Sequence, residues 1–225
     1  IDFNGRLITR AAAGGIFAHG LHVAGITGGA GIKEELYTGY APKSTLLSQS
    51  FSNVIVNSPA YVQDYGMVLT NNSYGSIVGD CNYMGLYDLY SRILDSMALQ
   101  LPSLQNVFAA GNDGLFACSY YPPGFGTVLS GYQSAKNTLM VGNTDVDGKL
   151  NPGSSKGPVK DGRIKPEISA MGTFVASTWP INIYSYNTGT SMAAPAVTGG
   201  LALLYERYRQ VHAGANPKSG LMKAL

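Results

Sequence analysis

The chain has 225 residues, 45% of them hydrophobic and 12% charged, a composition that suits one globular domain with a substantial core. Its formal net charge of +2 and its scattered basic residues argue against nucleic acid or a membrane surface as a partner. No apolar run approaches the roughly 18 residues that a membrane span requires, so we expect no span.

The two ends of the chain suggest a piece of a longer polypeptide. It begins with Ile1 rather than Met, and it stops at Leu225 inside an expected helix. No basic and then apolar signal segment opens it. We therefore expect residues 1–225 to be a single domain that is truncated at both ends.

Two histidines, His19 and His22, introduce a helix that is expected near residues 20–27. A neutral imidazole accepts a proton near neutral pH, so His19 is a candidate general base, although a single histidine is more often a packed core residue. The His-x-x-His spacing also suggests zinc. No Glu in this helix completes a metalloprotease motif, however, and we expect no metal.

The loop from Gly28 to Gly31 is rich in glycine, which is a weak signal for phosphate binding. No Gly-Lys-Ser/Thr follows it, and Glu34 and Glu35 would repel a phosphate. The loop also has too few oxygen ligands for calcium. We therefore expect no cofactor.

Short apolar runs predict strands near residues 46–51, 67–72, 106–110 and 138–142. Apolar residues at helical spacing predict helices near residues 20–27, 86–100, 192–209 and 219–225. This alternation predicts an α/β fold with a doubly wound, mostly parallel sheet and helices on both faces. Sites in such sheets gather at the carboxyl ends of the strands.

Polar residues follow two of the predicted strands. Asn71 and Ser73 lie where one strand runs into a turn, a pattern that also fits a glycosylation acceptor. Asn112 follows the next strand between glycines, usually the mark of a turn. A neutral amide at that position can also donate an N–H group to a developing negative charge without titrating.

Residues 115–135 are expected to form a long surface loop that contains Cys118. Cys81 and Cys118 can form one disulfide, but two cysteines in a chain of this length do not establish an oxidising compartment. The bonded and the free states both remain open.

Ser191 lies between the turn at Gly189 and a helix of small and apolar residues. In the first turn of a helix, unpaired N–H groups and the helix dipole favour a developing oxyanion. A Thr-Ser pair before such a helix is usually only a cap, so the spacing alone leaves a cap and a nucleophile as alternatives.

Taken together and in this order, four segments resemble the subtilisin-like serine protease (subtilase) family, and the resemblance covers most of the chain. The matching segments are His19-Gly20-Leu21-His22-Val23-Ala24-Gly25, Ser73-Tyr74-Gly75, Ala109-Ala110-Gly111-Asn112 and Gly189-Thr190-Ser191-Met192-Ala193-Ala194-Pro195. The resemblance implies a serine endopeptidase with Ser191 as nucleophile, His19 as general base and Asn112 as oxyanion donor. Leu21 replaces a threonine of the family pattern.

The resemblance also implies how substrate binds. The edge formed by Ser73, Tyr74 and Gly75 would pair with an extended peptide, and Ala110 and Gly111 would complete the substrate site. It further implies a protein or peptide substrate, cleavage after large apolar residues, a monomer, and a secreted or cell-surface location.

The aspartate of the family's catalytic triad is not visible in the chain. The family pattern places it before Ile1, and Asp2 is a weak substitute because Asn-Gly follows Phe3 where Ser/Thr-Gly is expected after the acid. We therefore expect the chain by itself to be nearly inactive.

Two rival classes remain. The first is a non-catalytic relative of the family that acts as a binding module, which the missing aspartate would suit. The second is an α/β-hydrolase esterase, which needs Gly-x-Ser-x-Gly and a histidine after the serine, where only His212 is present.

Overall fold

The computed structural model of the chain describes residues 1–10, 15, 17–75, 80–118 and 120–225. Its centre is a four-stranded parallel sheet in the order β3-β4-β5-β6. These strands are β3 (Leu69–Asn72), β4 (Gln105–Ala109), β5 (Leu139–Thr144) and β6 (Ile168–Met171). Two smaller pairs are separate from this sheet: β1 (Leu7–Ile8) with β2 (Leu46–Leu47), parallel, and β7 (Val175–Trp179) with β8 (Ile183–Asn187), antiparallel.

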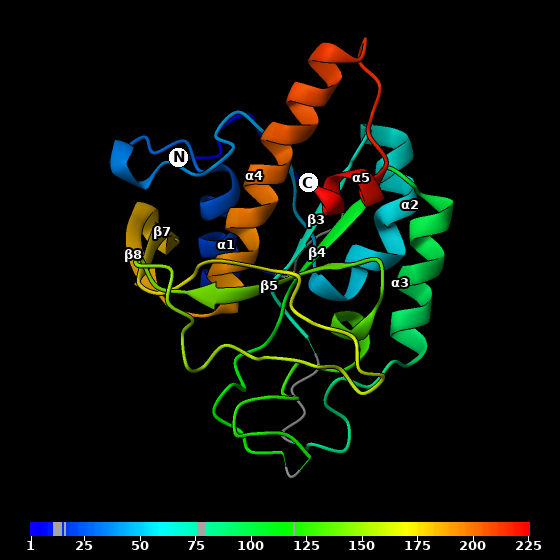
Figure 1. Cartoon of the computed structure of the whole chain (residues 1–225). Helices are drawn as coiled ribbons and strands as arrows, with labels where there is room; N and C mark the ends of the chain where they lie inside the picture. The colour runs from blue at the N-terminus through cyan, green and yellow to red at the C-terminus, as the bar shows by residue number, and fades with distance from the viewer. Residues whose placement is uncertain (11–14, 16, 76–79, 119) are drawn as a thin grey trace.

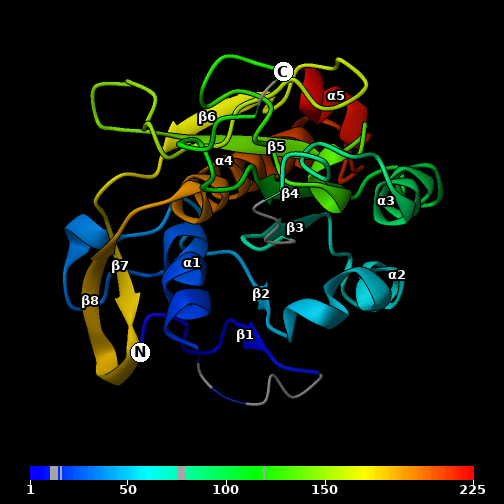
Figure 2. The same ribbon diagram turned by 90° about the horizontal axis from the view of Figure 1, so that it is seen from below.

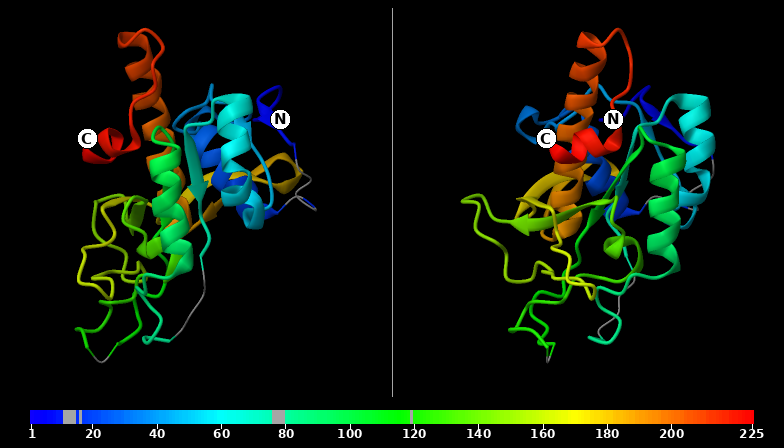
Figure 3. Two further views of the ribbon diagram at one scale, coloured as in Figure 1. Left: turned by 90° about the vertical axis from the view of Figure 1, so that its right-hand side faces the viewer. Right: turned by 45° about the vertical axis from the view of Figure 1, so that its right-hand side comes forward.

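Helices cover both faces of the sheet (Figure 1). They are α1 (Ala18–Gly28), α2 (Val54–Tyr65), α3 (Leu89–Gln100), α4 (Thr190–Val211) and α5 (Ser219–Ala224). Short 3-10 turns are found at Glu35–Tyr37, Phe51–Asn53, Gly131–Ser134 and Pro180–Asn182. Figure 2 and the right-hand view of Figure 3 show α1 beside α4, with α2 and α3 on the opposite side of the molecule.

The alternation of side chains along β4 explains this layering. Val107 and Ala109 pack against Ala193 and Leu201 of α4, whereas Phe108, between them, packs against Leu94 of α3. Successive residues of a strand point to opposite faces, so a strand that is buried throughout must be covered on both sides. The predicted α/β fold with helices on both faces of a mostly parallel sheet is confirmed.

The predicted strands near residues 67–72, 106–110 and 138–142 are present as β3, β4 and β5. The strand expected near residues 46–51 is wrong in extent, because β2 ends at Leu47 and a 3-10 turn at Phe51–Asn53 leads into α2. Helix α2 itself was not predicted. Its β-branched residues and the internal Pro59 are poor helix formers, and tertiary packing overrides that preference.

Strands β6, β7 and β8 were also not predicted. Their residues are largely exposed or half-buried, so they lack the apolar runs that revealed the central strands. The predicted helices are found as α1, α3, α4 and α5. Helix α3 begins at Leu89 because the Asp88 carboxylate accepts the N–H groups of Tyr90 and Ser91.

Cys81 and Cys118 form a disulfide, which settles the alternative that the sequence left open. The bond joins the turn before α3 to the surface loop after β4. Within the residues that the structure describes, no helix is long and apolar enough to cross a membrane. Over the same residues, no cluster of His, Cys, Asp and Glu side chains has the arrangement of a metal site.

Candidate active site

Ser191 is the second residue of α4 and lies at the carboxyl edge of the parallel sheet. The sharp entry into α4 depends on two glycines. Gly189 has φ 155°, which L side chains rarely adopt, and its N–H donates to the Gly172 carbonyl at 2.9 Å. A Cβ on Gly172 would lie 2.5 Å from the Gly189 carbonyl oxygen. The glycines therefore let the chain after β6 lie directly against the start of α4.

Asn112 is held in a single orientation by Thr190. The Asn112 Oδ1 atom accepts the Thr190 backbone N–H at 2.9 Å and is 3.1 Å from the Thr190 Oγ1. A backbone N–H can only donate, so the facing atom must be the amide oxygen. The Nδ2 group of Asn112 has no acceptor in the described part of the chain, and the Asn112 side chain is exposed. It is therefore free to donate to an incoming oxygen.

Ser191 contacts Ser73 through two hydrogen bonds. The Ser191 Oγ donates to the Ser73 carbonyl oxygen at 3.4 Å, and the Ser73 Oγ donates to the Ser191 carbonyl oxygen at 2.9 Å. The first contact is long, so the Ser191 hydroxyl is only weakly held. The start of α4 is thereby joined to the end of β3.

Packing joins α1, the helix that contains His19, to α4, the helix that contains Ser191. Thr27 donates to the Pro195 carbonyl at 3.4 Å, and Ile26 packs with Met192 and Ala196, so the second half of α1 lies against the first turns of α4. Val23 packs against the same cluster, and His19 lies one turn before it on the same helix face. Figure 2 shows the two helices beside each other.

Among the described residues, no hydrogen bond joins the side chains of His19 and Ser191. The His19 side chain is exposed at the start of α1. Desolvation of the covered part of the ring lowers the pKa of His19. The shift favours the neutral imidazole, which is the form that accepts a proton.

His22, by contrast, is fully buried, and its Nε2 lies 3.0 Å from the Ser185 carbonyl oxygen. Burial lowers the pKa of His22, which keeps this ring neutral in the core. It therefore packs α1 against β8 rather than facing the site.

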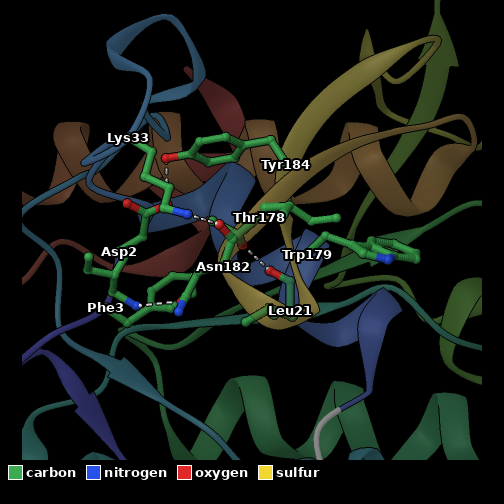
Figure 4. Close-up of a pocket in the computed structure, with 10 residues that line it drawn as sticks. Asp2, Phe3, Leu21, Lys33, Thr178, Trp179, Asn182 and Tyr184 are labelled. Carbon is green, nitrogen blue, oxygen red and sulfur yellow. Dashed lines mark hydrogen bonds between the residues drawn. The ribbon is translucent and has the colours of Figure 1, made fainter.

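None of the 13 acidic residues, all of which the structure describes, forms a hydrogen bond or ion pair with His19. Asp2 in particular is used elsewhere. Its Oδ1 accepts the Ile32 N–H at 2.8 Å, and its Oδ2 accepts the Tyr184 hydroxyl at 2.9 Å. Figure 4 shows both Asp2 and Tyr184 at a small cavity of about 50 Å³ beside Leu21. Asp2 is therefore not the acid that orients His19.

The five candidate substrate-binding residues lie at the carboxyl ends of neighbouring strands, Ser73 to Gly75 after β3 and Ala110 with Gly111 after β4. The Tyr74 side chain turns inward, because its hydroxyl donates to Asn72 Oδ1 at 2.9 Å and its ring packs edge-on against Phe108. Only the backbone of Tyr74 is thus placed to contact a ligand.

Sequence reasoning missed Gln133, which supports both of these strand ends. This buried side chain donates to the Tyr74 carbonyl at 2.8 Å and to the Ala109 carbonyl at 3.2 Å. A Cβ on Gly75 would lie 2.5 Å from the Gln133 Nε2. A glutamine inside a predicted surface loop has no local pattern that would reveal such a role.

Fold and site together define a class: a parallel α/β domain with a serine at the start of a helix, next to a threonine that orients an amide donor. A model of the subtilase family of peptidases matches residues 9–225, and the chain belongs to that family.

Curated relatives include tripeptidyl-peptidase 2 of Oryza sativa subsp. japonica, 31% identical over 206 residues, and thermitase of Thermoactinomyces vulgaris, 28% identical over 199 residues. These alignments cover 83% and 85% of this chain. They span only 15% of the tripeptidyl-peptidase and 62% of thermitase.

Solved structures with the same fold include the prenylagaramide maturation protease PagA and the CspB protease of Clostridium perfringens. PagA has a TM-score of 0.72 at 24% identity and covers 100% of this chain and 78% of its own. CspB has a TM-score of 0.76 at 16% identity and covers 92% of this chain and 74% of its own. At these identities the likeness supports the fold alone.

Proposed function

We propose that the protein is a serine endopeptidase in which Ser191 is the nucleophile, His19 the general base and Asn112 the oxyanion donor. The observation that carries the proposal is the orientation of Asn112. Thr190 occupies the amide oxygen of Asn112, which leaves the Nδ2 donor free next to the candidate nucleophile. Membership of the subtilase family supports the same assignment.

The proposed reaction begins when the Ser191 hydroxyl leaves the Ser73 carbonyl and turns toward His19. The imidazole accepts the hydroxyl proton as Oγ attacks the peptide carbonyl carbon, and the carbonyl oxygen becomes negative. Asn112 Nδ2 and the Ser191 backbone N–H, which has no partner among the described residues, donate to that oxygen. The His19 imidazolium then returns the proton to the leaving amine, and water releases the acyl group in the reverse sequence.

Protein or peptide substrates are expected to lie along the ends of β3 and β4. Leu129 supports a preference for large apolar side chains, because it lies beneath Gly75 and Gly111, whose added Cβ atoms would come within 2.8 Å and 2.7 Å of it. The Cys81–Cys118 disulfide supports a secreted or cell-surface location. We expect the domain to act as a monomer without nucleic acid.

We further propose that residues 1–225 by themselves turn over substrate slowly. Without a carboxylate at His19, the ring lacks a partner that fixes its tautomer and stabilises the imidazolium. In the serine protease for which this loss is known, it is roughly 10⁴-fold in turnover. The lack of a carboxylate at His19 also favours a second candidate function, a subtilase-like binding module without catalysis.

One experiment separates the two candidates. Casein hydrolysis and labelling by a fluorophosphonate are measured for the 225-residue chain, for a version extended by any residues that the gene encodes before Ile1, and for Ser191→Ala in each. An endopeptidase predicts faster labelling in the extended version and none in Ser191→Ala. Equal casein hydrolysis with and without Ser191 would exclude the mechanism, and an unlabelled extended protein would favour the binding module.

A further inference from the structure

The carbonyl of Ser191 lacks its partner within the helix. In α4 this oxygen would accept the N–H of the residue four positions later, which is Pro195 and has none. Ser73 supplies the missing donor, with its Oγ 2.9 Å from the Ser191 carbonyl oxygen. The first turn of α4 therefore depends on a side chain at the end of β3.

The hydrogen bonds that link Ser73 to Asn71 and Thr198 have a fixed order of donors and acceptors. Because the single hydroxyl proton of Ser73 is used on Ser191, the Ser73 oxygen can only accept from Asn71, whose Nδ2 lies 3.1 Å away. This arrangement turns the Asn71 Oδ1 toward α4, where the Thr198 hydroxyl donates to it at 2.9 Å. The order of donation is thus Thr198 to Asn71, Asn71 to Ser73, and Ser73 to Ser191.

Thr198 is placed for this contact by the helix itself. It lies seven residues after Ser191, so both side chains share one face of α4, and it is only 4% exposed. Its hydroxyl is also 3.0 Å from the Ala194 carbonyl, which already accepts a backbone N–H as part of the helix. The Asn71 oxygen has no such second donor among the described residues and takes the hydroxyl proton of Thr198.

We infer that Thr198 and Asn71 are positioning residues for Ser191. Neither contacts the reacting atoms. They hold the Ser73 hydroxyl against the Ser191 carbonyl and so fix the first turn of α4, from which both the nucleophilic Oγ and an oxyanion N–H project. The inference rests on the proposed serine-peptidase function and adds two residues to its machinery.

The test uses Thr198→Val, which keeps the shape of the side chain and removes its hydroxyl, in the protein as the gene encodes it. We expect kcat to fall about 10- to 100-fold through misplacement of Ser191, while KM changes less than about twofold. Thr198→Ser keeps the hydroxyl and should restore kcat to within about threefold of the wild type. Asn71→Asp keeps the acceptor for Thr198 but loses the donor to Ser73, and it should resemble Thr198→Val.

Thr138→Val is the matched control. Thr138 is equally buried, and its hydroxyl donates to the Ala135 carbonyl at 3.3 Å, away from the site. A merely structural role predicts that Thr198→Val and Thr138→Val lower Tm alike and leave kcat at the wild-type value. A wild-type kcat for Thr198→Val, measured at a temperature below the Tm of both variants, overturns the inference.

A crystal structure of Thr198→Val gives a readout that does not depend on turnover. We expect the Ser73 Oγ to move beyond about 3.5 Å from the Ser191 carbonyl oxygen. An unchanged contact overturns the inference even if the wild-type protein shows no serine-dependent hydrolysis. In that case the proposed function fails separately, on the comparison of wild type with Ser191→Ala.

Discussion

At the scale of single residues, Asn112 shows how one contact determines what a side chain can do. Asn112→Asp keeps an oxygen for the Thr190 N–H but replaces the donor with a negative charge where the oxyanion forms. We expect kcat to fall about 100-fold or more, a magnitude taken from the equivalent loss in subtilisin itself, with little change in KM.

The Asn112→Asp measurement is steady-state hydrolysis of a peptide ester or amide. Asn57→Asp on α2 serves as the control and should retain wild-type kinetics, because among the described residues the Asn57 side chain bonds to Gln49 alone. Equal kcat values for the wild type and Asn112→Asp would show that this side chain does not bind the oxyanion.

Lys165 is a buried cation whose effect on stability depends on pH. Burial lowers the pKa of Lys165 from 10.5 to about 8, although Glu167, 2.5 Å away, opposes the shift. Between these two pH values the unfolded chain binds more protons than the folded one, so the free energy of unfolding rises with pH across this window.

Lys165→Met should abolish that rise, because Glu167 keeps its contacts with Lys223 and the Met140 N–H. Urea unfolding at pH 8 and at pH 10 measures this difference. Between these two pH values, the free energy of unfolding should rise in the wild type by on the order of 1–3 kcal/mol more than in Lys165→Met. Parallel curves for the two proteins would contradict a lowered pKa in the folded state.

At the scale of elements, the contact between α1 and α4 depends on small residues. Two adjacent glycines of α4 provide a matched pair, since a Cβ on Gly199 would lie 2.5 Å from the Tyr40 Cβ, whereas a Cβ on Gly200 would meet nothing within 4 Å. Gly199→Ala should destabilise the protein by about 1–3 kcal/mol through overpacking against the chain that follows α1.

Gly200→Ala should instead stabilise the protein by about 0.5–1 kcal/mol, because alanine loses less conformational entropy in a helix. Chemical denaturation of both variants measures the two signs. Equal effects would mean that helix propensity, and not the close approach of Tyr40, dominates at Gly199.

At the scale of the whole molecule, the Cys81–Cys118 disulfide closes a loop with a sequence separation of 37 residues that includes α3 and β4. Loop-closure entropy predicts that replacing both cysteines with serine lowers the free energy of unfolding by about 3–4 kcal/mol. Urea unfolding measures this loss in three samples: the wild type, the wild type with dithiothreitol, and the double-serine variant. Three identical unfolding curves would show that the disulfide does not constrain the unfolded chain.

Local sequence determined the parts of this protein that depend on neighbouring residues. Apolar runs predicted β3, β4 and β5 because these strands are buried on both faces, and the motifs around His19, Asn112 and Ser191 predicted the family and the candidate site. The extent of β2 was wrong, and the helix α2 and the strands β6 to β8 were missed, because their local patterns are weak and their conformations depend on packing with distant segments.

Only the tertiary structure decided how the site is held. Thr190 orients Asn112 across 78 residues of sequence, Ser73 replaces the helical partner of Ser191 across 118, and Thr198 reaches Asn71 across 127. Each of these contacts joins segments that meet through chain topology, so no periodicity or spacing along the sequence predicts it. The sequence by itself determined which chemical groups are present, and the fold decided which of their donors and acceptors remain free to react, because a hydrogen bond made within the fold occupies a group that would otherwise meet the substrate.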